Sequence, residues 1–259
     1  MIKKVDFHIN ELENMKKYPK ELFSIGNTSL LKKKKISIIG SRKPNVYTQH
    51  KTSELAKKLS DRGICIVSGG AIGVDAIAHT SAGADNTIMV AATGLDKRYP
   101  SINKNLISDI ESKGLILSQF IEGSPSTRYN FVLRNELVVA LGDVVIVTYA
   151  DLNSGSMRSV EYALAMGKEI YVLSHRIGES QATNNLLSEG KAIAIYDIEA
   201  FVKEFTGEDF LEAVKHDDFF EFCKTNPRYE EALQKYPNRV FEAELSGEIE
   251  IKNGVCKLL

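Results

Sequence analysis

The hydrophobic positions of this chain fall into short runs, separated by longer stretches with helical spacing. Seven apolar runs rich in β-branched residues predict buried strands, at residues 36–39, 64–67, 87–92, 115–118, 144–147, 169–173 and 192–196. Between them, apolar positions recur at intervals of three and four, which predicts helices from Pro44 to Gly63 and at 74–82, 103–113, 131–141, 157–166 and 183–189. Strands that alternate with helices indicate βαβ crossovers. We therefore predict an α/β fold, a Rossmann-like doubly wound parallel sheet over residues 36–206.

The segments on either side of this pattern differ from it. Residues 1–35 are mixed in character and are predicted as an N-terminal extension, which ends in Lys32-Lys33-Lys34-Lys35. Such a run of lysines is typical of a solvated linker, although it could also be an arm that contacts phosphate.

A change of pattern after Gly207 predicts a second, smaller domain over residues 210–259. Its sequence predicts helices at 210–224 and 229–236, and then strands at 240–245 and 248–258. The pair Asn253-Gly254 is a strong signal for a hairpin turn. Helices followed by a hairpin predict a winged-helix-like module.

Composition and charge exclude several classes of protein. The chain has 259 residues, 43% of them hydrophobic, and no apolar run long enough to cross a membrane. Its first residues lack the apolar stretch of a signal peptide, and its three distant cysteines and five scattered histidines show no spacing for a metal. We therefore expect a soluble, reduced, cytoplasmic protein without a membrane or metal association.

The net charge of −1 gives no overall signal for nucleic acid, but the charge is unevenly distributed. Residues 211–259 carry seven Lys+Arg and ten Asp+Glu, so the remaining 26 basic and 24 acidic residues give the upstream part a balance of +2. A site for a polyanion should therefore be a local patch on the large domain.

Several turns predicted to follow strands carry groups suited to phosphate. Ser68-Gly69-Gly70 links a strand to a helix with an open backbone, which suits an anion but is equally compatible with a tight turn that binds nothing. Arg42 and Lys43 follow the first predicted strand, where an arginine can grip phosphate oxygens or simply pair with a nearby acid. Because ligands of such sheets bind beyond the carboxyl ends of the strands, these turns indicate a common site.

Two further stretches fall at the same predicted edge. Arg128, Phe131, Arg134 and Asn135 combine cations with an aromatic ring, as single-stranded nucleic acid requires, although Phe131 could equally be a core residue. Ser154-Gly155-Ser156 opens a helix and would let a phosphate approach closely, while Ser156 could also serve as a helix cap. No histidine or cysteine lies beside a candidate nucleophile in the sequence, so nothing in the chain demands catalysis.

Five ordered motifs carry a family resemblance, namely Gly40-Ser41-Arg42, Val67-Ser68-Gly69-Gly70-Ala71-x-Gly73-Val74-Asp75-x-x-Ala78-His79, Gly94-Leu95-Asp96-x-x-Tyr99-Pro100-x-x-Asn103, Phe131-x-x-Arg134-Asn135 and Ser154-Gly155-Ser156. Over about residues 36–192 the chain resembles the DNA-processing protein A family, DprA or Smf. The short acidic C-terminal module is similar to that of family members from epsilon-type bacteria.

The resemblance implies a function. Members have an extended Rossmann domain that binds single-stranded DNA, and duplex DNA more weakly, without a cofactor or a catalytic step. They protect incoming strands during natural transformation, help load the RecA recombinase and act as dimers. Carried over, the resemblance places phosphates at Arg42 and Ser68-Gly69-Gly70, with Arg128 and Lys168 as added cations. It has Phe131 stack a base, Ser154-Gly155-Ser156 line the same pocket, and Arg134 and Asn135 shape its rim.

Two other classes of function stay open at this point. An enzyme related to the lysine-decarboxylase-like group would hydrolyse nucleoside monophosphates, and Ser154-Gly155-Ser156 with Glu161 is faintly similar to its phosphate turn. Alternatively, the chain could be a protein adaptor whose acidic module docks a partner. Release of free base would favour the first, and failure of the large domain to bind DNA would favour the second.

Overall fold

The computed structural model describes residues 1–207, 218–245 and 247–258. The chain forms two compact units, Met1–Gly207 and Glu208–Leu259, and each is described by itself.

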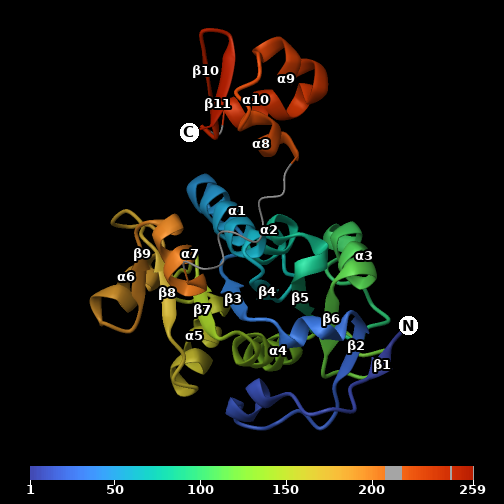
Figure 1. Cartoon of the computed structure of the whole chain (residues 1–259). Helices are drawn as coiled ribbons and strands as arrows, with labels where there is room; N and C mark the ends of the chain where they lie inside the picture. The colour runs from blue at the N-terminus through green and yellow to red at the C-terminus, as the bar shows by residue number, and fades with distance from the viewer. Residues whose placement is uncertain (208–217, 246, 259) are drawn as a thin grey trace. The chain divides into compact units, whose positions relative to one another are not determined.

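The first unit is built on one nine-stranded sheet (Figure 1). Seven of its strands are parallel: β3 (Lys35–Ile39), β4 (Cys65–Ser68), β5 (Thr87–Val90), β6 (Leu115–Ser118), β7 (Val144–Val147), β8 (Ile170–Leu173) and β9 (Ile193–Ile195). Their order in the sheet is β6-β5-β4-β3-β7-β8-β9, so the chain adds strands on one side of β3 and then crosses to the other side at β7. The predicted doubly wound α/β fold is confirmed, and β3 and β7 form its topological switch point.

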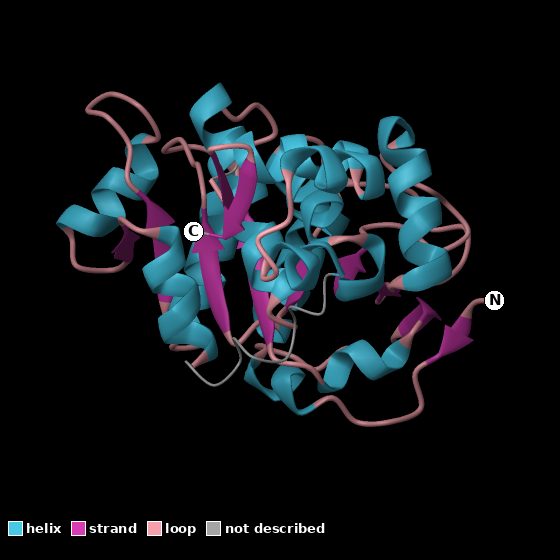
Figure 2. Ribbon diagram, turned by 45° about the horizontal axis from the view of Figure 1, so that its top comes forward, coloured by secondary structure: helices cyan, strands magenta, loops and turns pink. Residues whose placement is uncertain are grey.

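Helices cover both faces of the sheet (Figure 2). One face is covered by α1 (Val46–Asp61), α2 (Val74–Ala82), α3 (Lys104–Lys113) and α7 (Ile198–Thr206), and the other by α4 (Arg128–Leu141), α5 (Gly155–Ala165) and α6 (Gln181–Ser188). Successive residues of β4 serve the two faces, because Ile66 packs with α1 and α2 while Cys65 and Val67 pack with α4. Burial on both faces explains why the strands are apolar without a polar alternation.

Residues 1–35 are an integral part of this unit. Strand β2 (Phe23–Gly26) pairs antiparallel with β6, and β1 (Lys3–Lys4) pairs with β2. The 3₁₀ helices η1 (Asn10–Asn14) and η2 (Thr28–Lys32) bring Leu12 and Leu30 into the core.

The expectation of a solvated lysine linker is wrong at Lys35, which is the first residue of β3 and only 3% exposed. Its ammonium lies 2.6 Å from Glu11 Oε1 and donates to the carbonyls of Leu31 and Lys33. A buried lysine needs such partners, and the sequence pattern alone does not reveal them.

The described part of the second unit contains helices and a hairpin. Its described elements are α8 (Asp218–Cys223), α9 (Tyr229–Lys235), α10 (Pro237–Leu245), β10 (Ile249–Lys252) and β11 (Val255–Leu258). The hairpin turn at Asn253-Gly254 is confirmed, with φ of 54° and 72°. Residues 210–217 of the first predicted helix lie outside the described residues, and the winged-helix assignment stays a prediction.

The strand predicted at residues 240–245 is wrong, because these residues belong to α10. Phe241, Ala243 and Leu245 alternate with polar residues and so imitate the period of a strand. The buried positions are instead Val240 and Ala243, one helical turn apart, and Pro237 occupies the first helical position, where proline is favoured.

In the part of the chain that the structure describes, no helix has the length and apolar character needed to cross a membrane.

Candidate nucleic-acid interface

The carboxyl ends of β3 and β7 diverge into loops that leave a groove of about 610 Å³ between them. This is where ligands bind in doubly wound sheets, since the loops on the two sides of the switch point turn away from each other. The loop after β3, the start of α4 and the start of α5 supply its walls. The residues along the groove are Ile39, Gly40, Ser41, Arg42, Lys43, Ala71, Asp75, Arg128, Phe131, Val132, Arg134, Asn135, Asp151, Ser154, Gly155, Ser156, Arg158 and Ser159.

Phe131 lies at one end of the groove in a cluster of aromatic and cationic side chains. The Arg42 guanidinium carbon lies 5.4 Å from the centre of the Phe131 ring, and the Tyr99 ring lies 5.8 Å from it. A smaller cavity of about 80 Å³ opens among Arg42, Tyr99 and Phe131. An exposed arginine held over an aromatic ring offers both a charge for phosphate and a plane for a base.

Arg134 lies beneath this cluster and is only 5% exposed. Its guanidinium donates to the carbonyls of Gly69 and Val90, and burial lowers its pKa while the nearby Asp75 opposes that change. Asp75 in turn accepts a hydrogen bond from the Ala71 amide, and burial raises the pKa of its carboxyl against the charge of Arg134. The turn at residues 69–71 is therefore fixed from below by a buried cation and a buried acid.

The start of α5 forms the opposite wall of the groove. Ser154 occupies the N-cap position without capping the helix through its side chain, and its buried hydroxyl has no hydrogen-bond partner among the residues that the structure describes. Gly155 is exposed, and a Cβ added there would meet no atom within 4 Å. The first amides of α5 thus face an open space at the positive end of the helix dipole, which favours an anion.

The structure brings most of the predicted site residues together. Arg42, Lys43, Arg128, Phe131, Arg134, Asn135, Ser154, Gly155 and Ser156 all line the groove. Asn135 also links two helices, since its amide nitrogen lies 3.5 Å from the carbonyl oxygen of Gly155 on α5. Arg134 supports the floor rather than the rim.

Three other predicted residues lie elsewhere. Ser68 is buried and donates its hydroxyl to the carbonyl of Ile38, and Gly70 is buried against Met89, so of the glycine turn only Gly69 and Ala71 reach the two cavities. Lys168 lies at the opposite edge of the sheet, just before β8, where it donates to the carbonyls of Ala140 and Gly142 at the end of α4. Burial lowers the pKa of this lysine.

Sequence reasoning missed Tyr99, Ile72 and Arg158 as lining residues. Tyr99 is exposed and belongs to the motif Tyr99-Pro100-x-x-Asn103. This motif was the sequence feature that could have indicated Tyr99 as a residue of the site. Asn103 explains the rest of that motif, because its amide donates to the carbonyls of Gly70 and Ala71.

His79 provides a test of how this region is packed. The ring is fully buried, and its Nδ1 donates to Thr87 Oγ1, whose own proton goes to the Ile66 carbonyl. Burial, followed by the charge of Arg134, lowers the pKa of His79 to about 3.

Since the unfolded chain binds a proton near pH 6.5, stability is present above that pH and is lost as the pH falls toward the folded value. We expect a loss of about 1.4 kcal/mol for each pH unit below 6.5 from this residue alone. Chemical denaturation between pH 7 and pH 5 measures it, and His79→Asn should flatten the profile. An equally steep profile in that variant would contradict the assignment.

Among the described residues there is no group of three or more His, Cys, Asp and Glu side chains that could hold a metal ion.

The family of the chain can be decided by comparison with known proteins. The model of the family described as DNA recombination-mediator protein A matches residues 3–206. The chain belongs to this family.

Individual relatives support the same assignment. DNA processing protein DprA of Streptococcus pneumoniae is 34% identical over 176 residues, which cover 66% of this chain and 62% of that protein. Protein Smf of Synechocystis is 35% identical over 164 residues, which cover 62% of this chain and 41% of that protein. The chain therefore spans about half the length of these relatives.

Two solved structures of family members have the same fold. The structure of DNA processing protein A from Helicobacter pylori is 40% identical with a TM-score of 0.77, over 79% of this chain and 95% of that one. The structure of DprA from Streptococcus pneumoniae is 32% identical with a TM-score of 0.72, over 77% of this chain and 71% of that one. The match extends through β1 and β2, so residues 3–35 belong to the family domain.

Proposed function

We propose that this chain binds single-stranded DNA along the groove between β3 and β7 and acts as a recombination mediator. The observation that carries the proposal is the exposed Arg42 held over Phe131, beside the open start of α5. The related protein from Helicobacter pylori, described by its single-stranded DNA binding mode, supports it.

In this proposal the strand is held by two kinds of contact, to its phosphates and to its bases. Arg42, Lys43 and Arg128 attract the phosphates, together with the first amides of α5 at Gly155 and Ser156. Phe131 offers a ring for a base, and stacking of this kind tolerates any sequence. The buried Arg134 and the linking Asn135 keep these walls in place.

The biological role follows from the family as a further part of the proposal. The chain would protect incoming strands during natural transformation, help load RecA on them, work as a homodimer and bind duplex DNA more weakly. The nucleotide-hydrolase alternative is not favoured, since a groove lined by several separate cations suits a long polyanion better than one phosphate.

Fluorescence anisotropy of a labelled oligo-dT strand tests the binding. We expect tight binding by the wild type that weakens steeply between about 50 and about 200 mM salt. Arg42→Ala should weaken binding about tenfold and lower the slope of log K against log salt by about 0.7, because it removes one phosphate contact and one partner of Phe131.

Lys57→Ala is the matched control, since it also removes one positive charge but lies on α1 in an ion pair with Asp61. If the wild type does not bind the oligo-dT strand at low salt, the proposal is wrong. Release of free base from a nucleotide would support the hydrolase instead.

A further inference from the structure

A second aromatic cluster lies at the same edge of the sheet, on the other side of the loop after β3. His175 follows β8 and lies between two tyrosine rings, Tyr47 at the start of α1 and Tyr149 after β7. The ring centres are 5.8 Å and 5.2 Å apart, and both pairs are nearly perpendicular, at 84° and 80°. The groove described above does not include these three rings.

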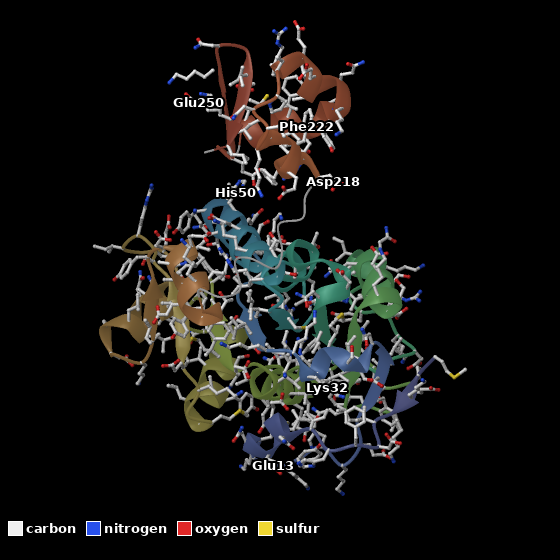
Figure 3. The ribbon with its side chains drawn as sticks, in the orientation of Figure 1. Glu13, Lys32, His50, Asp218, Phe222 and Glu250 are labelled. Atoms are coloured by element: carbon white, nitrogen blue, oxygen red, sulfur yellow. The ribbon has the colours of Figure 1, made fainter. Side chains whose placement is uncertain are left out.

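The cluster is held rigidly from behind. His175 Nε2 lies 2.7 Å from the carbonyl oxygen of Thr148, to which it donates, and its buried Nδ1 has no partner in the described part of the chain. Tyr47 is the outward member, with 46% of its surface exposed in the first turn of α1. Figure 3 labels His50, which lies three residues further along the same helix. Tyr47 is braced by His175, which in turn packs on Tyr149, and a ring held in this way loses little conformational freedom when it binds a flat ligand.

The loop after β3 connects this cluster directly to the groove. The Ser41 amide donates to the Tyr149 carbonyl at 2.9 Å, and the next residue, Arg42, lies over Phe131. Tyr47 follows five residues later, so its Cα is at most about 18 Å from that of Arg42. The exposed Lys43 lies between Arg42 and Tyr47 in the sequence, and the exposed Arg176 follows His175.

We infer that Tyr47, braced by His175, is a second base-stacking subsite for the strand that occupies the groove. The inference rests on the proposed function and extends it, since the strand would run along the loop after β3 from Phe131 to Tyr47. Cations that alternate with exposed rings are the pattern by which proteins hold single strands. A copy of this chain or another protein is the competing occupant of the exposed ring, and the experiments below separate these cases.

The first experiment compares long and short strands. Tyr47→Ala should weaken binding of oligo-dT of about 16 nucleotides roughly tenfold, and should leave binding of a dinucleotide unchanged, because so short a strand fills only the Phe131 end. Tyr47→Phe should bind like the wild type. Val46→Ala is the neighbouring control, since Val46 is also exposed and apolar but has no ring.

The second experiment uses the absence of tryptophan from the sequence. Tyr47→Trp places a single tryptophan at the subsite, and long oligo-dT should quench its fluorescence by stacking. Phe7→Trp is the control, because Phe7 is equally exposed (45%) but lies in the N-terminal segment.

The outcomes separate the two proposals. If Arg42→Ala weakens binding of the strand but Tyr47→Ala does not, and bound strand does not quench the fluorescence of Tyr47→Trp, this inference is wrong. The proposed binding of the strand in the groove would still hold. If the wild type binds no oligo-dT, both fail. If Tyr47→Ala changes only the oligomeric state of the protein, the ring belongs to a contact between copies and the inference is overturned.

Discussion

Replacing Arg134 by leucine is expected to lower the free energy of unfolding by about 3–5 kcal/mol, because it leaves a buried acid without its cation. The guanidinium satisfies the carbonyls of Gly69 and Val90, and its charge opposes the rise that burial causes in the pKa of Asp75. Leucine would fill part of the space and supply none of these interactions. Urea denaturation at pH 7 measures the loss.

The loss of unfolding free energy in Arg134→Leu should be smaller at low pH. Burial raises the pKa of Asp75, and loss of Arg134 would raise it further. A carboxyl whose folded pKa lies above its unfolded value, near 3.9, stabilises the fold at low pH and loses that contribution as the pH rises through the folded pKa. The difference between variant and wild type should therefore be smaller at pH 5 than at pH 7.

Arg128→Leu is the matched control, since Arg128 lies on the same helix but is exposed. It should change stability by no more than about 0.5 kcal/mol. A loss below about 1 kcal/mol for Arg134→Leu would show that the buried cation does not hold the turn.

Leu12→Ala is expected to lower the free energy of unfolding by about 2–5 kcal/mol, because Leu12 is fully buried and the truncation leaves a cavity. A substitution in a solvated extension would have almost no effect. Thermal unfolding followed by circular dichroism checks the change, and Ile102→Ala, at a position 78% exposed, is the control.

Leu12→Ala should leave the affinity for oligo-dT unchanged while the protein is folded, since Leu12 is not among the groove residues. Equal stability of Leu12→Ala and Ile102→Ala would contradict the assignment of residues 1–35 to the core.

The parallel strands could be predicted because local composition decides them. Each of β3 to β9 is a short apolar run bounded by turns, and burial on both faces of β3 to β7 removes any need for a polar alternation there. Strand β2 gave no such signal, since Phe23-Ser24-Ile25-Gly26 is short and is stabilised by antiparallel pairing with β6, about ninety residues away.

The groove was predictable for a related reason. Parallel strands place their carboxyl ends at one edge, so Arg42 and Ser154 could be brought together without knowledge of any contact. The environment of a long side chain could not be predicted in this way. Lys35 and Arg134 are both charged and nearly inaccessible. The Arg134 guanidinium donates to carbonyls from distant parts of the chain, and the Lys35 ammonium donates to the nearby carbonyls of Leu31 and Lys33 and pairs with Glu11. Lys168 precedes its strand rather than following it, and this places it at the opposite edge.

Helix α4 has a mechanical consequence for the groove. It has 14 residues and so measures about 21 Å, from the groove at Arg128 to the far edge, where Lys168 grips its last carbonyls. At its middle, Arg134 ties it to the backbone of Gly69 and Val90. A helix tied at its middle and at its last turn cannot swing outward as a whole, so any widening of the groove must come from the first turns of α4 and from the loops after β3 and β7.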